Sequence, residues 1–346
     1  VKMVLSNQFD EFQDVIVQSD DNIVLAGKTT QNGTEDFLLI RLQPDGSPDP
    51  FFGINGQVTT DFGGNNDCIY SLIIQPDRKI VVSGSSSIGS SYFVAARYLT
   101  DGTLDPSFGT LGKLQVLSGN RLDNCYGMTL QNDTSIVMVG THHSGSIDNY
   151  MVVRLTRNGA LDNSFGLNGV VLLQASLQTD QLNDVVVTKE GNILIAGSSS
   201  GAASMLLQLT YNGNPDPDFG INGFYQIGNT GTQSALNTLT VLEDSSVVAA
   251  GYNNNGADFD FLLTKAIIRS TTGVEENADY DLGVEIFPNP VINDFTIELP
   301  EPNGRPIAIS IFNEEGKSHA IFTGDTLFVG DVGRPDLLDG LMSKEQ

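Results

Sequence analysis

The chain has 346 residues, and its 42 aspartates and glutamates outnumber its 17 lysines and arginines, which gives a formal net charge of −25. A surface this acidic repels phosphate backbones and anionic lipids, so we expect neither a nucleic-acid partner nor docking on an anionic membrane. No stretch approaches the roughly 18–20 apolar residues of a membrane helix, so membrane insertion is not expected either.

Two unrelated markers recur along residues 1–270 with nearly the same period. The first is an apolar run that ends in glycine, with steps of 57, 56, 57 and 54 residues between copies. The second is Asp-Pro-Ser-Phe-Gly and its near-copies, with steps of 56, 57 and 54 residues. The glycines that close the first marker are Gly27, Gly84, Gly140, Gly197 and Gly251, and those that close the second are Gly53, Gly109, Gly166 and Gly220. Two markers with one period indicate a single unit copied end to end.

Each unit contains four short strand patterns separated by turn signals. In the second unit these are Cys68–Gln75, Ile80–Gly84, Tyr92–Tyr98 and Lys113–Leu117. The second pattern of each unit is apolar at successive positions, whereas a strand with one wet face alternates, so we expect both of its faces to be buried between neighbouring sheets. The sequence therefore predicts an all-β protein, a β-propeller of four-stranded antiparallel blades with about five blades present.

The order of an apolar run to glycine, Arg-Leu, Asp-Gly and Leu-Asp-Pro-Ser-Phe-Gly resembles the delta-60 repeat, a propeller-like family of bacterial surface and secreted proteins. The resemblance covers about 1–270 and carries over no catalytic residue. It implies a secreted or outer-surface location. The chain opens on a strand pattern with no signal peptide, so we expect its natural N-terminus to precede Val1.

Two ways of closing the ring remain open. The fifth unit stops after its third strand pattern, Phe259–Ile268, and Val1–Ser6 lies where a fourth strand belongs, so the N-terminal segment could complete the last of five blades. The alternative is a larger ring of which only these blades are present.

Charged residues that recur in the units are expected to serve the scaffold. Arginines in the third strand pattern and aspartates of the second marker recur together, and we predict that they form ion pairs. The arginines are Arg41, Arg97 and Arg154, with Gln208 and Lys265 in the matching places, and the aspartates are Asp49, Asp105, Asp162 and Asp216.

Connections of two kinds vary between units and share one face of an up-and-down propeller. They are the second-to-third loops (28–36, 85–91, 141–149, 198–204, 252–258) and the fourth-to-first loops (61–67, 117–124, 174–183, 228–235). Scaffolds carry recognition on such loops, so we expect this face to bind a partner. The candidate binding residues are His142, His143, Tyr252, Asp258 and Asp260.

We expect no metal or other cofactor. The adjacent His142 and His143 point to opposite faces of a strand and lack a third ligand. Asp258 and Asp260 lack the glycine and glutamate of a calcium loop, so a solvated acidic turn is the better interpretation. Cys68 and Cys125 are compatible with a disulfide or with two buried thiols.

The repeat ends at 270, and an acidic linker follows over 271–283. Residues 284–317, with Phe287-Pro288-Asn289-Pro290, resemble the first half of a C-terminal sorting domain of type IX secretion in Bacteroidetes, a β-sandwich-like fold. The resemblance implies export, with the secretion machinery as a partner.

Residues 318–346 are expected to form a short irregular tail. They resemble a metal-site segment of metallo-β-lactamase-fold hydrolases, in which Asp325 matches a metal-bridging aspartate. The chain has only three histidines and lacks that family's histidine cluster, so we predict no metal centre here. We interpret the tail as a chimeric join near 314–319.

The sequence thus favours a non-catalytic, secreted or cell-surface binding or scaffold protein that recognises a glycan or a protein. Two alternatives remain: a metal-dependent hydrolase, suggested by the tail alone, and a purely structural surface repeat.

Overall fold

The computed structural model describes the following residues: 10–31, 33–63, 66–87, 90–116, 122–132, 134–143, 145, 147–174, 180–199, 203–227, 233–242, 246–254, 259–267, 285–288, 295–298, 307–312 and 318–324. Over these residues the protein is all-β, as predicted. No helix in the described part of the chain is long and apolar enough to cross a membrane.

Five antiparallel sheets follow one another in chain order, one for each sequence repeat. The first comprises β1 (Asp10–Val17), β2 (Ile23–Gln31), β3 (Thr34–Leu42) and β4 (Gln57–Thr60). The second comprises β5 (Asn66–Ile74), β6 (Ile80–Ser87), β7 (Ser91–Tyr98) and β8 (Lys113–Val116). The third comprises β9 (Asn124–Leu130), β10 (Ile136–His143), β11 (Asp148–Leu155) and β12 (Val170–Leu173). The fourth comprises β13 (Gln181–Val187), β14 (Ile193–Ser199), β15 (Ala203–Leu209) and β16 (Phe224–Ile227), and the fifth begins with β17 (Ser234–Val241), β18 (Ser246–Asn254) and β19 (Phe259–Ile267).

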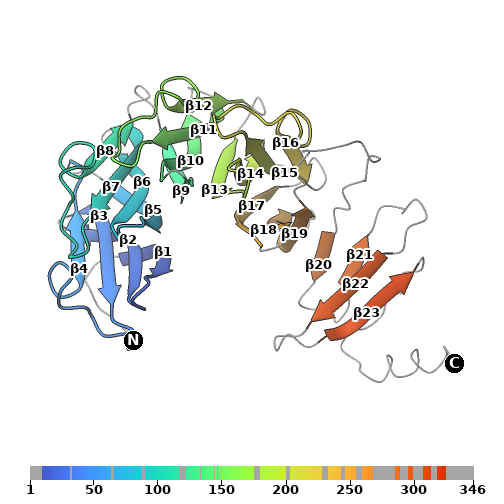
Figure 1. Cartoon of the computed structure of the whole chain (residues 1–346), viewed down its shortest axis with the longest axis horizontal. Helices are drawn as coiled ribbons and strands as arrows, with labels where there is room; N and C mark the ends of the chain where they lie inside the picture. The colour runs from blue at the N-terminus through green and yellow to red at the C-terminus, as the bar shows by residue number, and fades with distance from the viewer. Residues whose placement is uncertain are drawn as a thin grey trace.

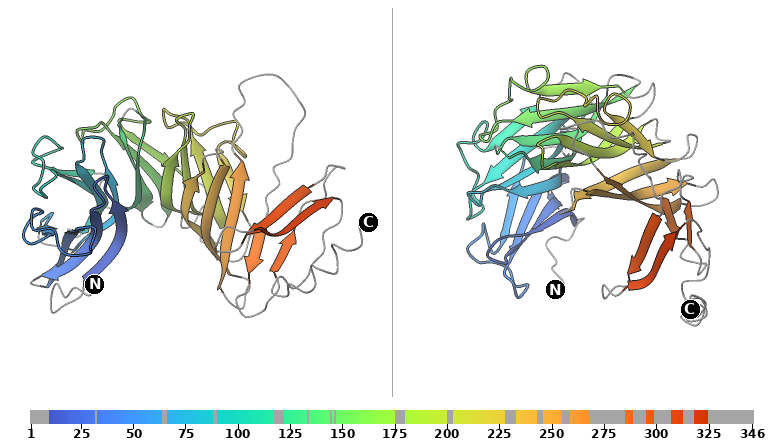
Figure 2. Two further views of the ribbon diagram at one scale, coloured as in Figure 1. Left: turned by 60° about the horizontal axis from the view of Figure 1, so that its bottom comes forward. Right: turned by 45° about the vertical axis from the view of Figure 1, so that its right-hand side comes forward.

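The sheets stand side by side along an open arc, like blades of a propeller whose ring is not closed (Figures 1 and 2). The position beside β19 is occupied by β20 (Glu285–Pro288), through the pair Leu263 and Ile286. Val1–Ser6, which could have completed the last blade, lies outside the described residues.

The core lies between the sheets. Four apolar clusters each join consecutive sheets; the first, for example, packs Phe37 and Phe52 against Ile80 and Tyr98. Residues of the central strands β6, β10 and β14 are buried on both faces, which confirms the expectation from their unbroken apolar pattern. Among the described residues, no sheet packs against the outer face of the first sheet or of the fifth, and β1 and β19 leave apolar side chains exposed there.

Both glycine markers have a steric cause. A Cβ on Gly84 would lie 1.9 Å from the carbonyl oxygen of Cys68, at a bulge between β5 and β6. Gly109 has φ of 51°, and a Cβ there would lie 2.3 Å from the carbonyl oxygen of Lys113. Only glycine fits both positions without moving the backbone. The first marker therefore fixes one backbone approach in all five sheets, and the second marker fixes another in the first four.

Cys68 and Cys125 are free and buried, so they are two buried thiols and not a disulfide. Burial raises the pKa of the Cys68 thiol to about 11 and that of Cys125 to about 12.

The C-terminal part forms two hairpins. β20 pairs with β21 (Phe295–Glu298), and β22 (Ile307–Phe312) pairs with β23 (Ser318–Gly324). β23 corrects the expectation of an irregular tail from residue 318, because Ile321, Phe322 and Thr323 are residues that favour strands and they pair with β22. Asp325 and the linker 271–283 lie outside the described residues.

Candidate functional site

The antiparallel order places the connections at two opposite edges of the arc. We call the edge with the first-to-second turns and the third-to-fourth connections the turn edge. The opposite edge, with the second-to-third and fourth-to-first loops, is the loop edge. The turn edge repeats its side chains from sheet to sheet, whereas the loop edge changes.

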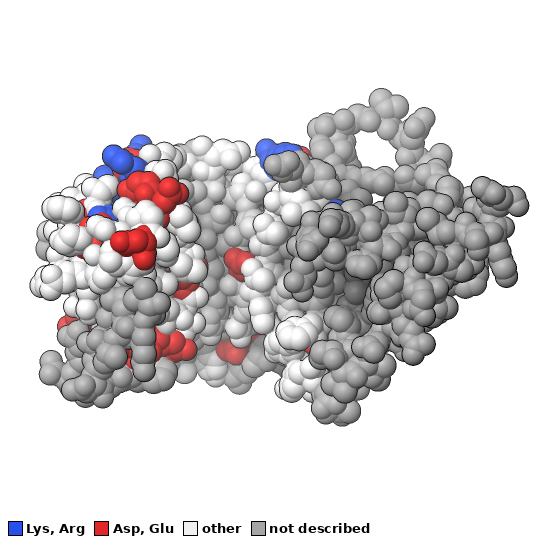
Figure 3. Space-filling view, turned by 90° about the horizontal axis from the view of Figure 1, so that it is seen from below, with Lys and Arg blue, Asp and Glu red and all other residues white. Residues whose placement is uncertain are grey.

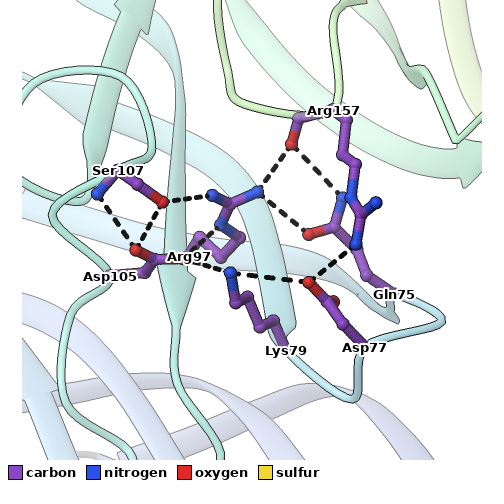
Figure 4. A network of polar contacts seen from close by, with 7 residues as sticks. All are labelled: Gln75, Asp77, Lys79, Arg97, Asp105, Ser107 and Arg157. Carbon is purple, nitrogen blue, oxygen red and sulfur yellow. Dashed lines mark hydrogen bonds and ion pairs between the residues drawn. The ribbon is translucent and has the colours of Figure 1, made fainter.

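At the turn edge of the second sheet, Arg97 is the centre of a buried polar network (Figure 4). Its side chain is 1% exposed, and its Nε donates to Asp105 Oδ2 at 2.9 Å. Its Nη1 donates to Gln75 Oε1 at 3.1 Å and to the Arg157 carbonyl at 2.6 Å, and its Nη2 donates to Ser107 Oγ at 2.9 Å. The predicted arginine–aspartate pair is thus one bond of a larger network.

The network holds Asp105 in its charged form. Burial opposes ionisation, but hydrogen bonds from Ser107 and Lys79 and the charge of Arg97 together hold the pKa of Asp105 well below its usual range. Arg97 Cζ also lies 4.9 Å from the centre of the Phe108 ring, so the phenylalanine of the second marker makes a cation–π contact with the guanidinium.

The third sheet repeats this network closely. Arg154 donates to Asp162 Oδ2 at 2.8 Å, to Gln131 Oε1 at 3.1 Å and to Ser164 Oγ at 3.0 Å. It also donates to the Tyr211 carbonyl at 2.6 Å, in the fourth sheet. In the fourth sheet the uncharged Gln208 replaces the arginine, and its Nε2 donates to Asp216 Oδ2 at 2.7 Å.

The first sheet departs from the pattern. Arg41 pairs with Asp49 at 2.8 Å and donates to the Thr100 carbonyl at 2.5 Å. Phe51, which is 80% exposed, stands where the other sheets have Ser107 and Ser164. Gln18 is the counterpart of Gln75, yet its Oε1 is buried without a hydrogen-bond partner among the described residues.

A pocket of about 310 Å³ lies beside Arg41 and Phe51, between the first and second sheets. Its lining includes Gln18, Arg41, Phe51, Arg78, Thr100 and Asp101. It offers guanidinium donors, an amide oxygen, an exposed phenyl ring and the carboxylates of Asp20 and Asp101, which can hold a small polar ligand with one flat face.

At the loop edge, the two candidate histidines bind different carboxylates. His142 is buried, and its Nδ1 lies 2.8 Å from Asp123 Oδ1. His143 is half-buried and contacts Asp148 through its Nδ1. They point apart, as expected of neighbours in a strand, and each has an acidic partner of its own.

The remaining loop-edge candidates are dispersed. Tyr252 in β18 packs edge-on against Phe259, with ring centres 5.5 Å apart. Asp260 lies half-buried in β19, and Asp258 lies outside the described residues. The face drawn in Figure 3 carries several separate acidic groups and few basic ones.

One recurrent residue was missed from the sequence. An aspartate precedes or opens the first strand of four sheets, at Asp10, Asp67, Asp123 and Asp180. Its steps of 57, 56 and 57 residues equal those of the first glycine marker, and that equality could have revealed it.

A match to a protein family covers the segments that carry the repeated network. The profile of a family described as "Domain of unknown function (DUF5122) beta-propeller" matches residues 18–52, 75–108 and 131–165. Each matched segment runs from the network glutamine, through the arginine and aspartate, to the buried phenylalanine. No curated protein matches the sequence.

Solved structures with a similar arrangement include a protein of unknown function from Bacteroides caccae, with 10% identity and a TM-score of 0.42, over 79% of this chain and 81% of that chain. Another is described as a "putative exo-beta-1,3-galactanase" from Bifidobacterium bifidum s17, with 10% identity and a TM-score of 0.41, over 74% of this chain and 87% of that chain. At this level of similarity, neither bears on the activity of this protein.

Proposed function

Since the chain is a β-propeller repeat protein, we propose that it is a non-catalytic binding or scaffold module that recognises a glycan or a protein through the loop edge. The contrast between the two edges supports this proposal. Polar side chains at the turn edge form one repeated internal network, whereas those at the loop edge differ from sheet to sheet apart from one recurring aspartate. Variable side chains on a rigid scaffold are typical of recognition surfaces.

We further propose that the protein acts outside the cell, exported by the secretion machinery. The delta-60-like repeats and the Phe287-Pro288-Asn289-Pro290 segment support this location. Residues 197–201 have the spacing of a nucleophile elbow, but Ser199 ends β14 and pairs with Ala203 of the antiparallel strand β15, whereas a nucleophile elbow joins a strand to a helix. The motif therefore lacks its structural context, which supports a non-catalytic role.

Arrays of glycans and of bacterial surface proteins, probed with the labelled chain, test the binding proposal. We expect His143→Ala and Tyr252→Ala at the loop edge to reduce the array signal at least several-fold. Arg157→Ala is the matched control, because its half-exposed side chain lies at the turn edge and bonds to Asp77.

Three outcomes are distinguishable. Loss of signal only in the loop-edge variants supports the proposal. If Phe51→Ser loses the array signal and the loop-edge variants keep it, the binding site is instead the pocket beside Arg41. Arrays without any binder would favour the purely structural surface repeat.

A further inference from the structure

The aspartate that recurs at the start of the first strand has a side-chain partner on the second strand in three sheets. Thr29 Oγ1 donates to Asp10 Oδ1 at 2.6 Å, and His142 Nδ1 lies 2.8 Å from Asp123 Oδ1. Ser199 Oγ donates to Asp180 Oδ1 at 3.3 Å. These three carboxylates therefore have a structural use within their own sheets.

Asp67 in the second sheet differs. Its side chain is 0% exposed, and its Oδ2 accepts a hydrogen bond from the Phe62 amide at 2.6 Å. Ser86, the counterpart of the partners in the other sheets, lies close enough to interact with this carboxylate, but neither Asp67 Oδ1 nor Ser86 Oγ makes a hydrogen bond of normal geometry. A buried carboxylate oxygen without such a bond is costly, so Asp67 Oδ1 is free to accept a further ligand.

Two further carboxylates converge on Asp67 from the first sheet. Asp36 lies near the start of β3, and Asp61 follows β4. One oxygen from each of the three aspartates lies within 4.8 Å of the others. Asp36 Oδ1 is also buried without a partner. Among the described residues, no lysine or arginine forms a salt bridge with Asp36 or Asp67.

We propose that Asp36, Asp61 and Asp67 form a binding site for a divalent cation of the size and hardness of Ca²⁺, which joins the first sheet to the second at the loop edge. Oxygen atoms that share a calcium ion at roughly 2.4 Å can lie up to about 4.8 Å apart, and the three carboxylate oxygens lie within that limit. Three carboxylates without nitrogen or sulfur ligands favour calcium over zinc.

The three aspartates range from buried to exposed, so an ion can enter the site from solvent. Asp67 is buried, Asp36 is half-buried and Asp61 is exposed. Three carboxylates this close together repel one another, and a bound cation removes that cost.

Thermal unfolding of the whole chain tests this site without reference to any glycan or protein partner. The chain has no tryptophan, so unfolding is followed by far-UV circular dichroism, first with a chelator and then with increasing CaCl₂. We expect Ca²⁺ to raise the Tm saturably, with one ion per chain by calorimetry, and an equal concentration of Mg²⁺ to raise it less. Asp67→Asn and Asp61→Asn should each weaken binding at least tenfold, and Asp61 is exposed, so its variant is expected to fold.

The matched control is Asp123→Asn, because Asp123 is the equivalent residue in the third sheet and its carboxylate already contacts His142. It should lower the Tm and leave the calcium response intact. By contrast, Asp67→Asn in chelator should not lower the Tm, because it removes one of three like charges. The proposal is wrong if the unsubstituted chain shows no calcium response, or if Asp61→Asn and Asp67→Asn respond as it does. That second result would mean diffuse binding to the acidic surface.

Discussion

Phe51 and Ser107 occupy the same position in two sheets, and the exchange changes what the neighbouring arginine can bind. In the second sheet Arg97 Nη2 donates to Ser107 Oγ, whereas Arg41 has no serine beside it. The glutamine next to Arg41 also keeps an unsatisfied oxygen. A single side chain therefore separates a closed network from an open pocket.

Phe51→Ser should close that network. Because the phenyl ring is 80% exposed, its removal costs little, and the new hydroxyl can accept from Arg41. We expect the free energy of unfolding to rise by about 1 kcal/mol, which chemical denaturation would detect. The reverse exchange, Ser107→Phe, should lower the unfolding free energy. A neutral or destabilising Phe51→Ser would show that the serine contributes nothing to the network.

At the scale of the element, the recurring glycine of the second strand sets the bulge that each sheet repeats. Gly84→Ala would place a methyl group 1.9 Å from the Cys68 carbonyl oxygen. Neither strand can move away without breaking the register of β5 and β6. We expect a loss of about 3–5 kcal/mol in stability, measured as a fall in Tm.

Gly191→Ala is the control, since its φ is 88° but the nearest atom to its Cβ is Tyr211 Cδ2 at 3.7 Å. It should cost about 1–2 kcal/mol from backbone strain alone. Equal losses of stability in the two variants would mean that the close approach of Gly84 to the Cys68 carbonyl oxygen adds nothing to the cost.

The elements themselves were predictable because repetition supplies several copies of each signal. The burial of β6, β10 and β14 followed from their apolar runs, and the arginine–aspartate pairs from their common period. The pocket was not predicted, since it depends on the loss of one hydroxyl at Phe51. The sequence does not distinguish Asp67 from Asp123, and only three-dimensional contacts show that His142 contacts Asp123 whereas Asp67 Oδ1 makes no hydrogen bond of normal geometry.

At the scale of the whole molecule, the two ends of the arc differ from its middle. β19 exposes Phe259, Phe261 and Leu263, and β1 exposes Val15 and Val17. Interior sheets bury the equivalent faces against a neighbour. Exposed apolar patches of this kind promote association.

We expect the chain to self-associate as its concentration rises, and Phe259→Ser combined with Phe261→Ser to reduce this association, measured by sedimentation velocity. Phe51→Ser removes a phenylalanine of similar exposure from the turn edge and should leave association unchanged. A chain that stays monomeric at every concentration would contradict the expectation, as would equal effects of the two changes.

The arginine network also fastens each sheet to the one that follows. Arg41, Arg97 and Arg154 donate to carbonyls of Thr100, Arg157 and Tyr211, each in the next sheet along the chain. Gln208 replaces the arginine in the fourth sheet, and its described bonds stay within that sheet. The fifth sheet is still bonded to the fourth through Asp184, which accepts from the Leu239 amide and the Thr238 hydroxyl, but it lacks the arginine bond. Deuterium should therefore enter the amides of β17–β19 ahead of those in β5–β15, because the fifth sheet opens first.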